Sequence, residues 1–171
     1  MQLGDEIKKV QKKFGKVYAP LKYFRGLKSP AAVERRYKRI LEGSKTKSDD
    51  PKAYRPFETD KGKKVRKSSY TAAFNREFPN AKSLKAKADA TGVPLDIIKE
   101  VYDKGLAAWR TGHRPGASQQ AWGYARVHSF LMKGCTFYTA DKYLVPKALK
   151  KMSKQNANRW LKRSSLCSKY K

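Results

Sequence analysis

The sequence predicts an all-α protein, a compact bundle of about six or seven short helices, on the strength of two observations. Apolar residues recur three or four positions apart in successive segments, which is the spacing of one face of a helix. Serine, proline and glycine stand at the ends of those segments, where they cap, start and stop helices. No large sheet is expected.

The N-terminal part of the chain predicts two helices. Residues 3–14 have apolar side chains at helical spacing, acids early and lysines late, as the helix dipole favours. Ser29 caps a second helix, Pro30 takes its first position, and Gly43 ends it. Residues 18–27 are too hydrophobic for a free linker and are expected to pack as an extended strap.

Residues 44–69 predict a turn-rich basic loop, because they contain Pro and Gly turn signals and no helical periodicity. A loop of this length is expected to be functional or disordered. Its cations are candidates for diffuse attraction to an anionic partner. They are Lys61, Lys63, Lys64, Arg66 and Lys67.

The rest of the chain predicts a run of further helices separated by glycine and proline. Capping serines precede two of them, and a short turn is expected near 139–145. The expected helices cover residues 70–78, 83–92, 94–104 and 119–133, and a last one begins at Pro146.

Residues 83–104 also match a helix-turn-helix template, with Ala88 small, Gly92 in the turn and Val93 as a buried anchor. The exposed face of the second helix would carry Asp96, Glu100 and Asp103, which are repelled by phosphates. Two core helices joined by a glycine turn are therefore the favoured interpretation.

The segment from Gly105 to Leu131 combines a forced turn with arginines and contains no acid. Gly112 and Gly116 accept positive φ, and the segment also holds Pro115, so a tight loop is expected there with His113 inside it.

Arg110, Arg114 and Arg126 bring charged planar forks to the same region. Two interpretations stay open: an anion pocket for a phosphate or a partner's carboxylate, or a structural role in which the guanidinium groups bond the loop. Because the segment has no carboxylate, a group outside it is expected to neutralise them.

The aromatic residues of the C-terminal half have two interpretations as well. They could stack on bases between arginines, as in single-strand binders, or they could form the core. The core is favoured, and Trp122 and Phe130 are expected to be buried together. The residues concerned are Trp109, Trp122, Tyr124, Phe137 and Trp160.

Charge is the dominant feature of the composition. Forty-one Lys and Arg against fourteen Asp and Glu give a formal net charge of +27 in 171 residues. From Lys104 onward the only acid is Asp141, and the last 25 residues hold nine cations. Such an excess is best tolerated against polyphosphate, anionic lipid or an acidic protein. The tail candidates are Lys150, Lys151, Arg159, Lys162 and Arg163.

A metal site, a cofactor and catalysis are not expected. His113, His128, Cys135 and Cys167 show no ligand spacing, and the cysteines predict neither zinc nor a disulfide framework, so a reduced intracellular setting is the default. Ser118 beside His113 lacks an orienting carboxylate, and the acids are too scattered for a metal-dependent nuclease. No small-molecule substrate follows from these residues.

The pattern AWxTGHRPGxSQxxWxxARVxSFL at Ala108–Leu131, following PLDIIKEVYDKG at Pro94–Gly105, carries a family resemblance. It resembles the core of a domain of unknown function that recurs in large DNA viruses of algae and protists and in tailed phages. The similarity extends upstream to YAPLKYFRGL at Tyr18–Leu27 and covers about residues 18–145. The resemblance implies a role in the virion or with the genome.

We therefore expect an N-terminal helical extension (1–16), a helical domain (17–145) and a basic C-terminal arm (146–171). The expected function is that of a basic structural component of a large DNA virus particle, a minor capsid or internal virion protein on the inner capsid face, present in the host cell during assembly. Its partners would be larger capsid subunits, with DNA or an anionic inner membrane beside them. The alternative is a viral DNA-binding protein that condenses or regulates the genome through the helix pair and basic loop, and a nucleic-acid-processing enzyme is a third reading.

Overall fold

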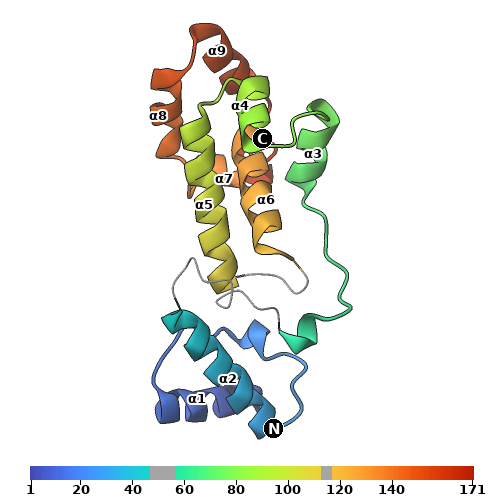
Figure 1. Cartoon of the computed structure of the whole chain (residues 1–171), viewed down its shortest axis with the longest axis vertical. Coiled ribbons are helices and arrows are strands. Elements are labelled where there is room, and N and C mark those ends of the chain that lie inside the picture. The colour runs from blue at the N-terminus through green and yellow to red at the C-terminus, as the bar shows by residue number, and fades with distance from the viewer. Residues whose placement is uncertain (47–56, 113–116) are drawn as a thin grey trace. The chain divides into compact units, whose positions relative to one another are not determined.

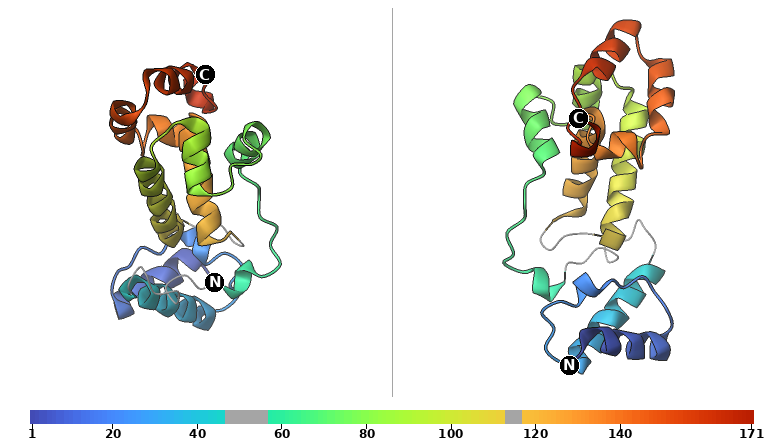
Figure 2. Two further views of the ribbon diagram at one scale, coloured as in Figure 1. Left: turned by 45° about the horizontal axis from the view of Figure 1, so that its top comes forward. Right: turned by 180° about the vertical axis from the view of Figure 1, so that it is seen from behind.

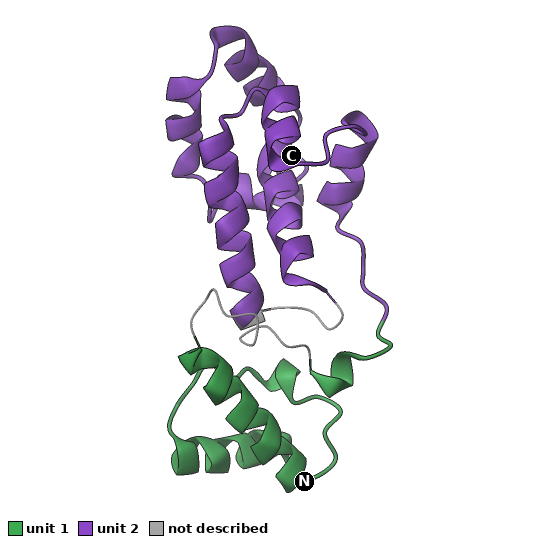
Figure 3. Ribbon diagram, in the orientation of Figure 1, with its two compact units in different colours: residues 1–63 green, residues 64–171 purple. Residues whose placement is uncertain are grey.

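The computed structural model describes residues 1–46, 57–112 and 117–171, and no strand occurs among them. The all-α prediction is confirmed, although these residues form nine α-helices and not six or seven. The chain divides into two compact units, residues 1–63 and residues 64–171 (Figure 3). This division differs from the segmentation expected from the sequence.

Unit 1 is built on two helices, α1 (Leu3–Phe14) and α2 (Pro30–Lys45). The apolar strap between them contains a 3₁₀ turn, Leu21–Tyr23, where an extended strap was expected. Tyr23 and Phe24 pack into the core, whereas Tyr18 and Leu21 are exposed. Tyr37 is fully buried, and its hydroxyl donates to the carbonyl of Gly15 at 2.6 Å. The buried hydrophobic side chains of this unit are Ile7, Val10, Tyr23, Phe24, Val33 and Tyr37.

Arg36 is a buried cation in unit 1. Its guanidinium donates to the carbonyl of Tyr23 and to Thr59 Oγ1, and it lies 4.1 Å from the ring centroid of Phe57. Burial lowers the pKa of Arg36. Through these contacts the 3₁₀ turn Glu58–Asp60 is attached to α2.

The described residues of unit 2 form seven helices (Figure 1). They are α3 (Ser69–Glu77), α4 (Leu84–Thr91), α5 (Leu95–Gly112), α6 (Gln119–Leu131), α7 (Cys135–Tyr138), α8 (Leu144–Lys151) and α9 (Lys154–Lys162). The side chains of Ser68, Ser83, Ser118 and Ser153 each accept a backbone N–H and begin α3, α4, α6 and α9.

The long helices α5 and α6 lie side by side (Figure 2). Their contact runs through glycine residues. A Cβ atom on Gly105 would lie 2.7 Å from the Cα of Gly123 and 3.0 Å from the carbonyl oxygen of Trp122. One on Gly123 would lie 2.5 Å from the ring of Tyr102. Only residues without side chains allow this approach.

The prediction that Trp122 is buried together with Phe130 is wrong. Trp122 is half-buried, whereas Trp109 and Trp160 are about 5% and 3% exposed. Phe130 is fully buried as expected, and it packs edge-on against Trp160 with ring centroids 5.3 Å apart. Phe137 is also buried, whereas Tyr124 is half-buried.

The C-terminal part also differs from its prediction. In place of one helix from Pro146 there are two, α8 and α9, which lie at the end of unit 2 where α5 begins and α6 ends. Trp160 anchors α9, because its indole N–H donates to the carbonyl of Leu131 at 3.0 Å.

Cys135 and Cys167 form a disulfide, with Cα atoms 4.7 Å apart. The expectation that the cysteines are reduced and unpaired is therefore wrong. The two residues are 32 positions apart, and only the return of the C-terminal segment to α7 brings them within bonding range. Sequence spacing does not contain that information.

Candidate polyanion-binding surface

Unit 2 contains 23 Lys and Arg and only six Asp and Glu. At least four of those acids form ion pairs within the unit. Glu77 pairs with Arg163, Asp89 with Lys85, Asp96 with Lys151, and Asp141 with both Arg126 and Lys104. Most acids of unit 2 therefore already neutralise a cation of the same unit. Most of its positive charge remains to be balanced by groups outside the chain.

Arg126 has its anion inside the protein. Its Nε and Nη2 donate to the two carboxylate oxygens of Asp141 at 2.9 and 2.8 Å, and Lys104 Nζ lies 3.4 Å from the same carboxylate. Asp141 is fully buried. The expected neutralising group outside the Gly105–Leu131 segment is thus Asp141 for Arg126, and this guanidinium performs a structural role.

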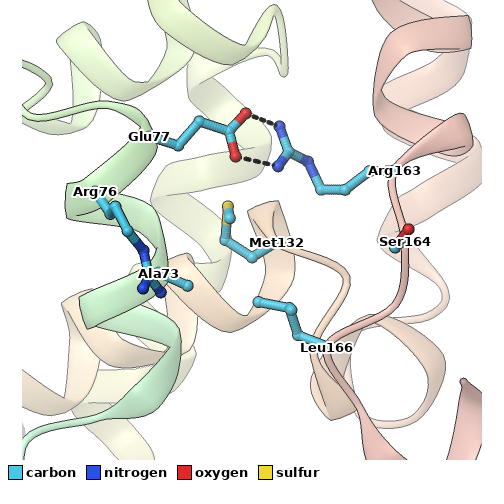
Figure 4. A pocket seen from close by; sticks show the side chains of 7 residues that line it. All are labelled: Ala73, Arg76, Glu77, Met132, Arg163, Ser164 and Leu166. Carbon is cyan, nitrogen blue, oxygen red and sulfur yellow. Dashed lines mark hydrogen bonds and ion pairs between the residues drawn. The ribbon is translucent and has the colours of Figure 1, made fainter.

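Arg163 is likewise paired internally. Its guanidinium donates two hydrogen bonds to the carboxylate of Glu77, and these bonds lower the pKa of Glu77 (Figure 4). The pair borders an open cavity of about 460 Å³. Its lining residues are Ala73, Arg76, Glu77, Met132, Arg163, Ser164 and Leu166.

The basic loop places its predicted cations at the surface. Lys61, Lys63, Lys64, Arg66 and Lys67 are all exposed. Lys61 and Lys63 belong to unit 1, whereas Lys64, Arg66 and Lys67 belong to unit 2.

The predicted arginine loop is only partly described. Arg110 is exposed near the end of α5. His113 and Arg114 lie outside the described residues. Trp109, which precedes Arg110 in α5, is buried, and its indole N–H donates to the carbonyl of Ala117 at 2.8 Å. For Arg110 and Arg114 the choice between an anion pocket and a structural role stays open.

Helices α8 and α9 carry four of the five tail candidates. Lys150, Arg159 and Lys162 are exposed, whereas Lys151 is engaged with Asp96. Between them α9 exposes three polar residues that the sequence-based candidates omit: Lys154, Gln155 and Asn158. The lack of any acid from Lys142 to the end of the chain could have pointed to Lys154, whereas no sequence signal distinguishes Gln155 and Asn158.

A buried polar cluster around His128 was not anticipated. His128 Nδ1 lies 2.9 Å from Thr71 Oγ1, and its ring stacks on Phe74 with centroids 4.6 Å apart. Lys87 lies over the rings of Phe74 and Tyr124, and its ammonium donates to the carbonyl of Ala81 at 2.6 Å. Burial lowers the pKa of Lys87.

Burial, with a smaller contribution from Lys87, lowers the pKa of His128 to about 4. The unfolded chain, with an ordinary His pKa near 6.5, binds a proton before the folded one does. The stabilising contribution of neutral His128 is therefore complete above about pH 6.5 and is lost as the pH falls toward 4, by up to about 3 kcal/mol. Urea denaturation between pH 7 and pH 4 measures this loss of unfolding free energy.

A His128→Phe variant should lose less unfolding free energy over the same pH range than the wild type. An equal loss in both proteins would contradict the lowered pKa of His128.

Two negative findings concern the described part of the chain. It contains no group of three His, Cys, Asp or Glu residues placed to hold a metal ion. None of its helices is long and apolar enough to cross a membrane.

Comparison with known proteins gives one match. The model of a family of unknown function, DUF5824, matches residues 20–164, a range that includes parts of both units. No curated protein and no solved structure matches the chain.

Proposed function

The chain belongs to this family of unknown function, and we propose that it is a basic structural protein of a virus particle, a minor capsid or internal component that binds larger capsid subunits and neutralises a polyanion at the inner face. The observation that carries the proposal is the commitment of the acids of unit 2. Asp141 is buried under Arg126, and other acids are paired, so the exposed cations of α8, α9 and the basic loop need an external counter-charge.

Two further features support a structural role. The resemblance of Ala108–Leu131 to a domain of large DNA viruses implies a virion or genome-associated protein. The large net positive charge of the chain destabilises its compact state through self-repulsion. The disulfide and the buried ion pair stabilise the fold against this effect. Enzymatic processing of nucleic acid has no comparable support, because at least four of the six acids of unit 2 are paired with internal cations.

Quantitative mass spectrometry of purified virus particles tests the proposal. We expect the protein in particles in fixed ratio to the major capsid protein. After particles are opened, rising salt should release the protein from the nucleic acid or lipid fraction, because contacts with many anions weaken steeply with ionic strength. Abundance in infected cells together with absence from particles would contradict the proposal.

A DNA-binding protein that condenses or regulates the genome is the second candidate. One observation favours it: α4 and α5 form a true helix pair, with Gly92 at φ 77° in the turn and Val93 about 1% exposed. The exposed face of α5, however, carries Asp96 and Asp103 with Lys99. The helix pair therefore has the geometry of a groove-binding motif and an unsuitable charge.

A further inference from the structure

Helix α9 has two chemically distinct sides. Trp160 lies on the inner side, about 3% exposed, and bonds the end of α6. The outer side follows the i, i+1, i+4, i+5, i+8 spacing of a helical stripe, and every residue on it is exposed. Those residues are Lys154, Gln155, Asn158, Arg159 and Lys162.

The stripe combines two kinds of group that duplex DNA recognises. Lys154, Arg159 and Lys162 are cations suited to phosphates. Gln155 and Asn158 carry amides, which donate and accept together and match the edge of adenine in the major groove. No acid occurs from Lys142 to the C-terminus, so nothing in this segment repels the backbone.

The dimensions and the surroundings of α9 also fit. Its nine residues make a helix about 13 Å long, with the diameter that a B-form major groove about 12 Å wide admits. Met152 and Ser153 separate it from α8, whose exposed Lys147 and Lys150 extend the positive surface. Duplex RNA has a deep, narrow major groove that such a helix does not enter.

We propose that α9 inserts into the major groove of double-stranded DNA, with its cations on the phosphates and Gln155 and Asn158 on base edges. The inference rests on the proposed function and deepens it, because it names the polyanion and the helix that binds it. It also moves the DNA-binding element from α5, where the sequence pattern suggested it, to α9.

Binding of the full-length chain to a labelled DNA duplex, followed by fluorescence anisotropy from about 50 to 200 mM salt, tests the phosphate contacts. The variant is Lys154→Gln/Arg159→Gln/Lys162→Gln, and the matched control is Lys12→Gln/Lys16→Gln/Lys28→Gln, which removes three exposed cations from unit 1. We expect the α9 variant to flatten the slope of log K against log salt by about two to three units and the control by less than one. Equal effects of both variants would overturn the proposal.

Base contacts are tested separately with Gln155→Ala/Asn158→Ala. Selection from randomised duplexes should give the wild-type protein a preferred site, and the double variant should lose about tenfold in preference for it with an unchanged salt slope. Absence of any preferred site for the wild type, or tighter binding to duplex RNA or anionic vesicles than to DNA, would overturn the proposal. Circular dichroism verifies that each variant is folded.

The outcomes separate the two proposals. Binding of vesicles in place of DNA, by a protein that is present in particles, would leave the structural function standing and remove the α9 inference. DNA binding through α9 by a protein that is absent from particles would do the reverse.

Discussion

Asp141→Asn is expected to lower the free energy of unfolding by about 3–5 kcal/mol. The carboxylate is fully buried and accepts two hydrogen bonds from Arg126, with Lys104 nearby. An amide would leave a largely buried guanidinium without its counter-charge, and removing one partner of a buried ion pair is strongly destabilising. Urea denaturation of the wild type and the variant measures the difference.

Asp89→Asn is the matched control. Asp89 also pairs with a lysine, but its side chain is about two-thirds exposed, so the change should cost no more than about 1 kcal/mol. Replacing both Asp141 and Arg126 by apolar residues of similar size, as in Asp141→Leu/Arg126→Met, should recover part of the loss. Similar effects of Asp141→Asn and Asp89→Asn would contradict the assigned role of the pair.

Opening the Cys135–Cys167 disulfide is expected to destabilise the protein by about 3–4 kcal/mol. The bond closes a loop with a sequence separation of 32, and the loss follows from the conformational freedom that the unfolded chain regains. The Cys135→Ala/Cys167→Ala variant should have the lower free energy of unfolding with and without reductant, whereas the wild type should have it only with reductant. Denaturation of both proteins under the two conditions measures the difference.

The double variant is also the control for the reductant, because its stability should not respond to it. Alkylation of the unfolded, unreduced wild type should modify neither cysteine. Two alkylated thiols, or a wild type indifferent to reductant, would contradict the disulfide.

Much of the fold could be predicted because its signals are local. Ser83 and Ser118 accept the N–H groups that their positions predict, and Gly92 ends α4 in the left-handed conformation. These features depend on neighbours within one turn of helix.

Features that depend on distant residues could not be predicted in the same way. The sequence indicates that Arg126 needs a partner from outside its segment, but not that Asp141 provides it. The disulfide requires a return of the chain that no spacing encodes. The burial prediction for Trp122 is wrong because α6 approaches α5 at Gly123, and the side chains of adjacent residues on a helix cannot both face the same neighbour.

The candidate polyanion-binding surface also has one part that the sequence predicts and one that only the fold reveals. Its charge and its lack of acid are visible in the sequence, whereas the side of α9 that faces outward is fixed by the burial of Trp160. Gln155 and Asn158 therefore become candidates only after the fold is known.

Because buried Trp160 anchors α9 to the end of α6 and the disulfide at Cys167 fixes the chain that follows, the backbone positions of its cations are set before any partner binds. A flexible lysine-rich tail of the same composition would lose about 1–2 kcal/mol of backbone entropy for each residue that binding orders. Here that loss is already included in the free energy of folding. The protein should consequently distinguish anions by the distance between their charges, a form of selectivity that a flexible polycation of equal charge does not have.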